Sequence, residues 1–311
     1  MRIAVMGAGG VGGYFGGLLA KAGQDVTFIA RGPHLEAIKA NGLAVTSELS
    51  GDFTVEGAAT DDTASVGPVD LVLYTVKMYH NAEAIPAVRP MIGPETVVLT
   101  LQNGVDNGHL LAADLGANHV MVGTAVVLAG IEKPGLVVQR GQVGSITFGE
   151  MSGGIKSRGQ TLLDVFQTAS WKVELSDNAM RALWRKFVYL TGSASVNAAT
   201  QITYGEMRAI PETRELIKTA WREIVAVAHA SGADPGDDVL DWCESSLDAF
   251  PAQGRTSLAN DFQAGRPVEI EGLTGAVVRL GREHNVPTPV HTTVYALLKP
   301  AALKIAGESP G

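Results

Sequence analysis

Apolar and polar positions follow two different periods in the first half of the chain. Short runs rich in β-branched residues, three of them nearly continuous in apolar side chains, are typical of strands covered on both faces. Stretches compatible with helices lie between these runs. The predicted strands span Arg2–Met6, Asp25–Ile29, Val69–Val76 and Thr96–Leu101, and the predicted helices span Val11–Ala22, Gly32–Ala40, Asn81–Arg89 and Asp106–Leu115. Strands and helices in alternation predict a parallel sheet with right-handed connections.

Two segments depart from this alternation. Leu43–Glu48 and Asp52–Glu56, separated by a short turn, predict a hairpin, and Leu136–Arg140 with Ser145–Phe148 predict another. A helix and a strand then close the first half, at Ser157–Ala169 and Lys172–Leu175.

From Asp177 onward the pattern is helical almost throughout. The clearest case is Pro211–Ala230, where proline stands in the first turn and apolar residues recur at three- and four-residue spacing. Four further helices are predicted on the same pattern, at Asp237–Leu247, Thr256–Ala264, Gly272–His284 and His291–Ile305. We therefore expect an α/β domain over residues 1–176 and an all-helical domain over residues 177–311.

Composition narrows the class of protein. The 311 residues contain 24 Lys and Arg against 32 Asp and Glu, a formal charge of −8, which argues against a nucleic-acid-binding protein. The single cysteine, Cys243, excludes an intramolecular disulfide and a cysteine-based metal cage, so we interpret it as a packed thiol. No apolar stretch reaches the ~20 residues of a membrane span. We expect a soluble, cytoplasmic protein with no metal site.

A glycine-rich motif begins directly after the first predicted strand. Gly7-Ala8-Gly9-Gly10-Val11-Gly12 matches G-x-G-x-x-G and leads into a helix and a second strand. In this context Gly7 allows a tight turn, Gly9 lets the backbone approach a pyrophosphate, and Gly12 lets the helix pack on the strand. The helix N-terminus then favours a bound anion. The motif predicts a Rossmann-type, dinucleotide-binding domain; a glycine-rich turn without a ligand is the alternative.

The residues after the second strand bear on the choice of nucleotide. NAD sites normally place Asp or Glu there to bind the ribose 2′-hydroxyl, but this chain continues Phe28-Ile29-Ala30-Arg31-Gly32. Arg31 lies 24 residues after Gly7, where a guanidinium can pair with a 2′-phosphate and no neighbouring carboxylate opposes it. We therefore predict NADP(H) as the cofactor. A solvated loop arginine is the alternative.

Motifs in both halves of the chain resemble the 2-dehydropantoate 2-reductase (ketopantoate reductase) family. They are MRIAVMGAGGVGGYFGGLLAKAG at the start, FIARGPHLEAI, TVK at 75–77, LQNG at 101–104, PG at 134–135, and SLANDFQAGRPVEIEGLTGAVVRLGREHNVPTP at 257–289. The resemblance covers nearly the whole chain in the family's order. It implies an enzyme that reduces the C2 ketone of 2-dehydropantoate with NADPH, which gives pantoate on the route to coenzyme A.

The resemblance also implies roles for individual residues. Hydride delivery to a ketone creates negative charge on oxygen, so a nearby proton donor is needed. Lys186, in Trp184-Arg185-Lys186, matches the family's general acid. The other matches are Glu269, which orients that lysine and meets the substrate hydroxyl and the cofactor; Ser257, which binds the substrate carboxylate; Asn103, which touches cofactor and substrate; and Lys77, which lies on the cofactor side.

Without the resemblance, simpler interpretations of these residues stay open. Lys186 is flanked by aromatic residues that could lower its pKa, but a surface lysine with a buried stem is the alternative. Glu269 could be a helix-capping carboxylate, and Asn103 could belong to a turn at a strand end. Ser257 could simply begin a helix.

The chain departs from the family pattern beside the lysine. The family carries asparagines four and eight residues after it, whereas this chain has Leu190 and Ala194. Asn197, 11 residues after Lys186, lies about three helical turns on and is the substitute we predict for substrate binding. A further family asparagine is replaced by Thr274. Because missing amides remove partners for substrate oxygens, the identity of the keto acid is open.

Three functions follow from these observations. The first is NADPH-dependent reduction of 2-dehydropantoate, and the second is the same chemistry on a different, more apolar keto acid. The third is a regulator that senses NADPH without turnover. For the enzyme, the partner is a small-molecule keto acid rather than a nucleic acid or a membrane, and a homodimer is a candidate assembly.

Overall fold

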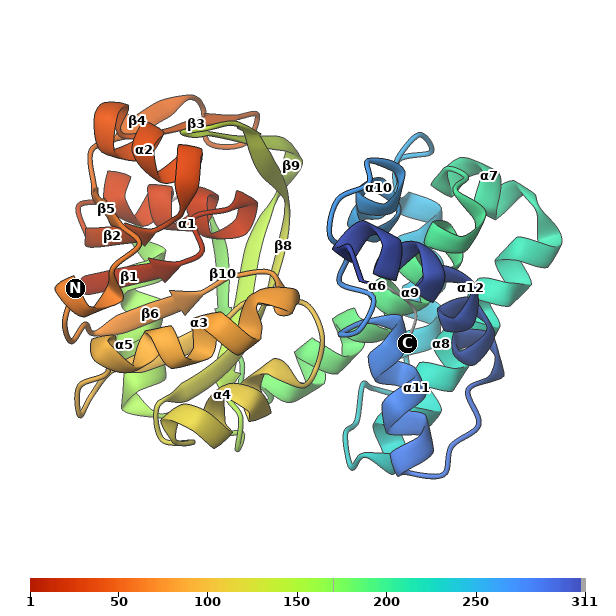
Figure 1. Cartoon of the computed structure of the whole chain (residues 1–311). Helices are drawn as coiled ribbons and strands as arrows, with labels where there is room; N and C mark the ends of the chain where they lie inside the picture. The colour runs from red at the N-terminus through yellow and green to blue at the C-terminus, as the bar shows by residue number, and fades with distance from the viewer. Residues whose placement is uncertain (170, 309–311) are drawn as a thin grey trace. The chain divides into compact units, whose positions relative to one another are not determined.

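The computed structural model describes residues 1–169 and 171–308, which divide into two compact units. The first unit comprises Met1–Gln102 and Asp106–Met180, and the second comprises Asn103–Val105 and the chain from Arg181 onward. In Figure 1 the first unit runs from red through yellow to light green, and the second continues from green to blue. An α/β unit is followed by a helical unit, so the predicted fold class is confirmed.

One ten-stranded sheet organises the first unit, with strand order β4-β3-β9-β8-β7-β6-β1-β2-β5 and β10 paired to β9. The strands that surround β1 are parallel, as predicted. β3 and β4 form the predicted antiparallel hairpin. The strands are β1 Arg2–Met6, β2 Asp25–Ile29, β3 Leu43–Ser47, β4 Phe53–Val55, β5 Ala58–Thr60, β6 Leu71–Tyr74, β7 Val97–Thr100, β8 Val120–Lys133, β9 Leu136–Glu150 and β10 Lys172–Leu175.

Strand alternation distributes the side chains of β1 between two cores. Ile3 and Val5 lie in one apolar cluster with residues of α1, α2 and α5, whereas Ala4 and Met6 lie in another with residues of α3 and α4. Because neighbouring residues of a strand point to opposite faces, a nearly continuous apolar run indicates a strand covered on both sides. The helices of this unit are α1 Gly10–Lys21, α2 Gly32–Asn41, α3 Asn81–Val88, α4 Asn107–Leu115 and α5 Ser157–Gln167, with short 3₁₀ turns at Thr63–Ser65, Met78–His80 and Arg89–Met91.

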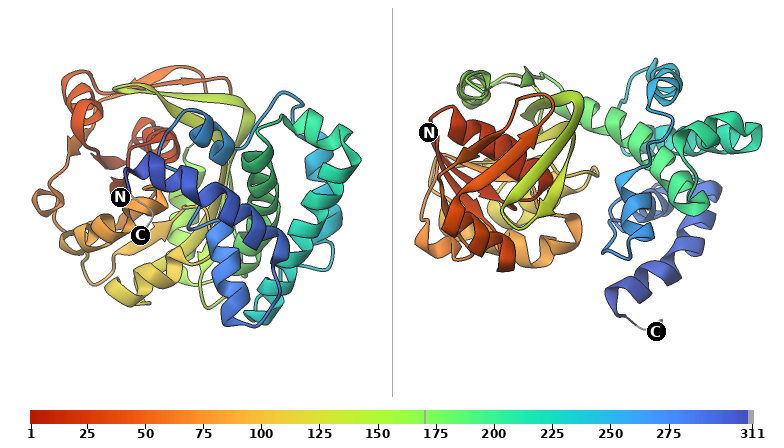
Figure 2. Two further views of the ribbon diagram at one scale, coloured as in Figure 1. Left: turned by 45° about the vertical axis from the view of Figure 1, so that its right-hand side comes forward. Right: turned by 90° about the horizontal axis from the view of Figure 1, so that it is seen from above.

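The hairpin predicted within residues 136–148 is wrong. β9 is one strand that runs through this region and pairs antiparallel with β8, and Figure 2 shows the two as a long yellow-green ribbon. Leu128 lies opposite Arg140 and Val127 opposite Gly144, so the residues between Arg140 and Gly144 bulge out of the ladder. Gly141 (φ 75°) therefore lies in a β-bulge rather than in a hairpin turn, and the chain reverses direction at Pro134-Gly135 instead.

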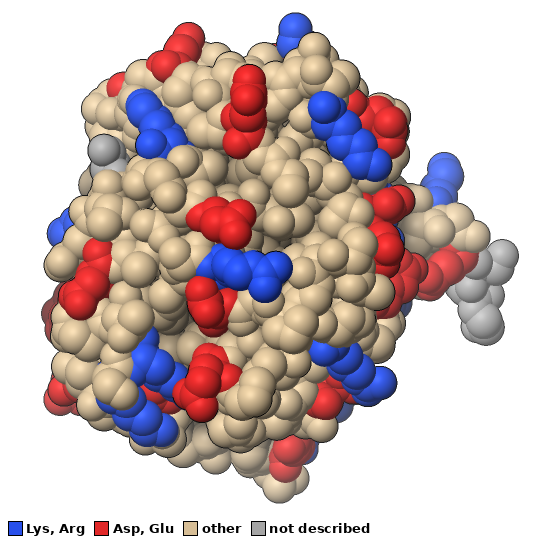
Figure 3. Space-filling view, turned by 90° about the vertical axis from the view of Figure 1, so that its left-hand side faces the viewer, with Lys and Arg blue, Asp and Glu red and all other residues tan. Residues whose placement is uncertain are grey.

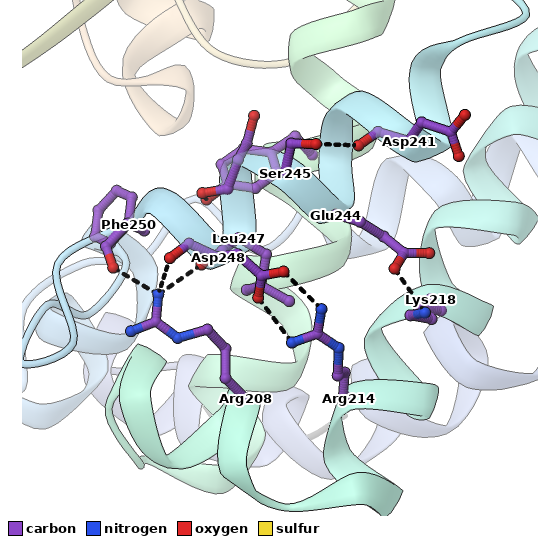
Figure 4. A network of polar contacts seen from close by, with 11 residues as sticks. Arg208, Arg214, Lys218, Asp241, Glu244, Ser245, Leu247, Asp248 and Phe250 are labelled. Atoms are coloured by element: carbon purple, nitrogen blue, oxygen red, sulfur yellow. Dashed lines mark hydrogen bonds and ion pairs between the residues drawn. The ribbon is translucent and has the colours of Figure 1, made fainter.

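The second unit is helical throughout its secondary structure in the described residues. Its helices are α6 Ala179–Thr200, whose first residues belong to the first unit, α7 Tyr204–Ala209, α8 Pro211–Ala230, α9 Val239–Ala249, α10 Ser257–Gln263, α11 Thr274–Glu283 and α12 Pro289–Ala306. Two arginines connect α7 and α8 to α9 (Figure 4). Arg208 donates to the carbonyl oxygens of Leu247, Asp248 and Phe250, and Arg214 binds the Asp248 carboxylate with both Nη atoms.

One face of the molecule mixes charges of both signs. On the face shown in Figure 3, lysines and arginines alternate with aspartates and glutamates, and no broad basic area is visible. Over residues 1–169 and 171–308, no helix has the length and apolar character needed to cross a bilayer. Within the same residues, no group of three or more His, Cys, Asp or Glu side chains is arranged to hold a metal ion.

Candidate active site

The glycine-rich loop lies between β1 and α1 and is fixed to the end of β2. The backbone N–H groups of Gly7 and Ala8 both donate to the carbonyl oxygen of Ile29, at 3.2 Å. Gly7 has φ 99°, a conformation that favours glycine, and a Cβ on Gly12 would lie 2.2 Å from the Gly7 carbonyl oxygen. The predicted reasons for glycine at these two positions are therefore structural properties of the loop.

Gly9 differs from the other glycines of the motif. Its φ of −76° suits any residue, and a Cβ added to it would meet no protein atom within 4 Å. It precedes the first turn of α1, where backbone N–H groups have no intrahelical partner and attract an anion. Since the protein itself does not require glycine here, we interpret the open space as room for a ligand that approaches the backbone closely.

We expect Gly9→Ala to weaken dinucleotide binding by about tenfold and to change the free energy of unfolding by less than about 1 kcal/mol. The matched variant is Gly10→Ala, because a Cβ on Gly10 would lie 2.2 Å from the carbonyl oxygen of Ala129 in β8. That variant should lose about 1–3 kcal/mol of stability through overpacking. Thermal melts and fluorescence titration with nucleotide separate the two effects, and unchanged binding by Gly9→Ala would contradict this interpretation.

Two side chains that the sequence analysis did not single out fix the same loop. The Thr75 hydroxyl donates to the carbonyl oxygen of Gly7 at 2.8 Å. His34 Nδ1 accepts from the backbone N–H of Gly135 at 3.0 Å, so its Nε2 carries the proton and donates to the carbonyl oxygen of Ala8 at 2.8 Å. His34 thus links the loop to the β8–β9 turn. Both residues stand in motifs quoted above, RGPHLE and TVK, but nothing local in these motifs indicates the contacts.

The ends of β2 and β6 place one cation on each side of β1. Arg31 follows β2 at the N-cap position of α2, and Lys77 follows β6. The prediction that no carboxylate opposes Arg31 is wrong. Oε2 of Glu83, in the first turn of α3, lies 2.8 Å from Nη1 of Arg31. Sequence proximity could not reveal this partner, which is 52 residues away.

Lys186 projects from α6, whose neighbouring residues anchor the helix. Trp184 and Phe187 are buried and meet edge to face, and Arg185 binds Asp238 and lies over the Trp242 ring. Lys186 is itself partly buried, and its ammonium donates to Oδ1 of Asn103 at 3.0 Å. The structure therefore brings together two predicted site residues that are 83 positions apart.

The surroundings of Lys186 change its acidity. Burial lowers the pKa of its ammonium to about 8, and the negative charge of Glu269 acts in the opposite direction. Glu269 is buried in the connection between α10 and α11, whereas Glu271 is exposed and pairs with Tyr295 and Lys299. The two neighbouring glutamates thus have different environments, and Glu269 acts on the lysine.

Asn197 has a different task from the predicted one. Its Oδ1 accepts from the backbone N–H and the hydroxyl of Thr256, at 2.8 and 3.0 Å, and its Nδ2 donates to the carbonyl oxygen of Ile202. The side chain is fully buried and its amide binds these protein groups, an arrangement that does not fit the predicted substrate contact. Thr256 caps α10, which begins with the exposed Ser257, so Asn197 holds the helix start that presents this serine.

The other departures from the family pattern make the face of α6 beside Lys186 less polar. Leu190 is partly buried and Ala194 is buried, so neither offers an amide. Thr274 is fully buried, and its hydroxyl pairs with that of Ser195 at 2.8 Å. On α6, Lys186 interacts with Asn103 and Glu269, whereas Leu190, one turn further along the same helix, is apolar.

Comparisons with known proteins identify the family of the chain. Residues 3–153 match the family model described as ketopantoate reductase PanE/ApbA, and residues 178–302 match the model of its C-terminal part. The 2-dehydropantoate 2-reductase of Halobacterium salinarum is 30% identical over 301 residues, which cover 96% of this chain and 98% of that protein.

Solved structures extend the likeness. A PanE/ApbA family ketopantoate reductase from Ralstonia eutropha has a TM-score of 0.90 at 33% identity and covers 98% of this chain and 100% of the other. A D-mandelate dehydrogenase, solved with NADH and anilino(oxo)acetate, shares the fold with a TM-score of 0.89 at 23% identity, over 98% of this chain and 99% of the other.

The matched family models and the named relatives, together with the glycine-rich loop after β1, place the chain in the class of oxidoreductases that use a nicotinamide cofactor. The two family models together account for most of the sequence. The chain belongs to the ketopantoate reductase PanE/ApbA family, which confirms the predicted resemblance.

Proposed function

We propose that the chain reduces the C2 ketone of 2-dehydropantoate to a hydroxyl with NADPH, which forms pantoate for coenzyme A synthesis. The carrying observation is the ammonium of Lys186, which is desolvated, hydrogen-bonded to Asn103 and influenced by the charge of Glu269. A cation with a lowered pKa suits both charge stabilisation and proton donation near neutral pH. The family membership and the relatives named above support the reaction.

The proposed residues divide the steps of the reaction among them. Bound NADPH supplies a hydride to the keto carbon. Lys186 polarises the keto oxygen and gives it the proton that completes the hydroxyl, while Asn103 orients the Lys186 ammonium through the 3.0 Å hydrogen bond. Glu269 keeps positive charge on the lysine by raising its pKa. Ser257, exposed at the start of α10, binds the substrate carboxylate.

For the cofactor, the supporting residues lie in the sheet unit. The loop from Gly7 to Gly12 holds the pyrophosphate, and the open space at Gly9 supports this placement. Lys77 follows β6, which pairs in parallel with β1, so it lies at the same end of the sheet as the glycine-rich loop. Arg31 binds the 2′-phosphate that distinguishes NADPH. The fold by itself does not select the nucleotide, since the D-mandelate dehydrogenase with this fold was solved with NADH.

A second substrate class rests on Leu190 and Ala194. A helix face without amides near Lys186 favours a keto acid whose side chain is apolar and lacks the hydroxyl of 2-dehydropantoate.

The two substrate classes are separated by one experiment, NADPH oxidation measured against a panel of 2-keto acids that differ in side-chain polarity. We expect the highest kcat/KM with 2-dehydropantoate. Higher kcat/KM with apolar 2-keto acids would select the second function. Tight NADPH binding without oxidation in the presence of any of these keto acids would contradict both substrate classes.

A further inference from the structure

The ion pair between Arg31 and Glu83 spans the end of β1. β1 lies between β2 and β6 in the sheet, Arg31 follows β2, and Glu83 lies on α3, which follows β6. Arg31 Nη1 and Glu83 Oε2 are 2.8 Å apart, within the unit that carries the glycine-rich loop. The pair therefore crosses the edge of the sheet at which this fold binds a dinucleotide.

Glu83 also supplies a group that the sequence lacks at its usual place. In sites for NAD a carboxylate at the end of the second strand accepts the hydrogen bond of the ribose 2′-hydroxyl. Here that strand ends in Ile29 and is followed by Ala30 and Arg31. Glu83 brings a carboxylate from another element to the guanidinium of Arg31, 2.8 Å from the group proposed to bind a 2′-phosphate.

The pair can open at little energetic cost. The Arg31 and Glu83 side chains are 61% and 64% exposed, and exposed ion pairs contribute little to stability. The hydrogen bond and charge of Arg31 hold the pKa of the Glu83 carboxyl below its usual value, with a smaller contribution from His80. Glu83 is thus an anion at neutral pH, able to accept a hydroxyl hydrogen bond and to repel a phosphate.

We propose that Arg31 and Glu83 form a two-sided nucleotide selector, in which Arg31 binds the 2′-phosphate of NADPH and Glu83 binds the 2′-hydroxyl of NADH. The chain therefore binds both nucleotides, with a preference set by the balance of the two side chains. This inference rests on the proposed use of a nicotinamide cofactor at the glycine-rich loop.

The test measures binding without turnover. Dissociation constants of NADPH and NADH are obtained by fluorescence titration of the wild type, Glu83→Gln and Arg31→Gln, and 2′,5′-ADP is titrated by calorimetry to probe the phosphate end alone. In Glu83→Gln we expect NADPH and 2′,5′-ADP to bind about three- to tenfold more tightly and NADH about three- to tenfold more weakly. Arg31→Gln should weaken NADPH and 2′,5′-ADP by about tenfold or more and spare NADH.

The matched control is Glu36→Gln. Glu36 is an exposed carboxylate on α2 that pairs with Lys39 instead of Arg31, so its replacement should leave the binding of both nucleotides unchanged. If Glu83→Gln shifts both nucleotides in the same direction, or neither, the selector is overturned. If neither nucleotide binds the wild type, or Arg31→Gln leaves NADPH binding unchanged, the proposed cofactor site itself fails.

Discussion

Replacement of Lys186 by methionine is expected to lower kcat for keto-acid reduction by about 10²- to 10⁴-fold, the usual contribution of a positioned general acid. Methionine keeps an unbranched apolar stem in the partly buried position and removes only the ammonium that donates to Asn103. The glycine-rich loop proposed to hold the pyrophosphate is unchanged in this variant, so the NADPH dissociation constant should stay within about twofold of wild type. Stopped-flow reduction and fluorescence titration measure the two quantities, and a variant with wild-type kcat would rule out Lys186 as the acid.

The pH profile tests the same residue independently. Because reduction requires the protonated amine and the pKa of Lys186 is lowered to about 8, kcat/KM should fall as pH rises through this value. Glu269 raises that pKa, so Glu269→Gln should move the alkaline limb of the profile to lower pH. Glu271→Gln is the matched control, since Glu271 is exposed and pairs with Lys299. A limb that does not move in Glu269→Gln would exclude the electrostatic role proposed for Glu269.

The second large effect concerns stability of the helical unit. We expect Glu223→Ala to lower the free energy of unfolding by about 3–5 kcal/mol, because it breaks a buried polar network. Glu223, in α8, is 7% exposed and accepts from the backbone N–H groups of Val290 and His291 and from His291 Nδ1. Its loss would leave the first turn of α12 and a fully buried imidazole without these bonds. Urea unfolding measures the difference.

Acid unfolding tests how the stability contributed by Glu223 depends on pH. Burial alone would raise the pKa of the Glu223 carboxyl, but the hydrogen bonds from His291 and Val290 outweigh it and hold the pKa below 4.5. A carboxyl group whose pKa is lowered by folding stabilises the folded state at pH values above its pKa in the unfolded chain. The stability that Glu223 contributes should therefore be lost as the pH falls below about 4.5. Glu223→Ala should show a shallower loss in that window.

A control on the same helix separates burial from charge. Glu215 is 62% exposed and pairs with Arg222, so Glu215→Ala should change the stability by less than about 0.5 kcal/mol. Equal losses in the free energy of unfolding of the two variants would show that the buried network around Glu223 stabilises the protein no more than the exposed ion pair does.

The sequence by itself determined those features that depend on neighbouring residues. Strands β1, β2 and β10 and helix α8 begin and end at the predicted residues, because their apolar spacing and terminal signals are local. The glycine-rich loop also follows from sequence, since a tight turn and close packing restrict Gly7 and Gly12 to glycine.

Only the tertiary structure decided contacts between distant segments. Residues 136–148 carry turn signals of a hairpin, yet pairing with β8 turns them into one bulged strand. Asn197 lies at a helical spacing from Lys186 that suits a substrate-binding residue, but its amide oxygen accepts a hydrogen bond from Thr256 at the N-terminus of α10. Glu83 looks like an ordinary helix residue until the sheet brings α3 to Arg31. In each case the deciding partner is supplied by chain folding, because hydrogen-bonding and charged groups take the partners that are near in space, whatever their separation in sequence.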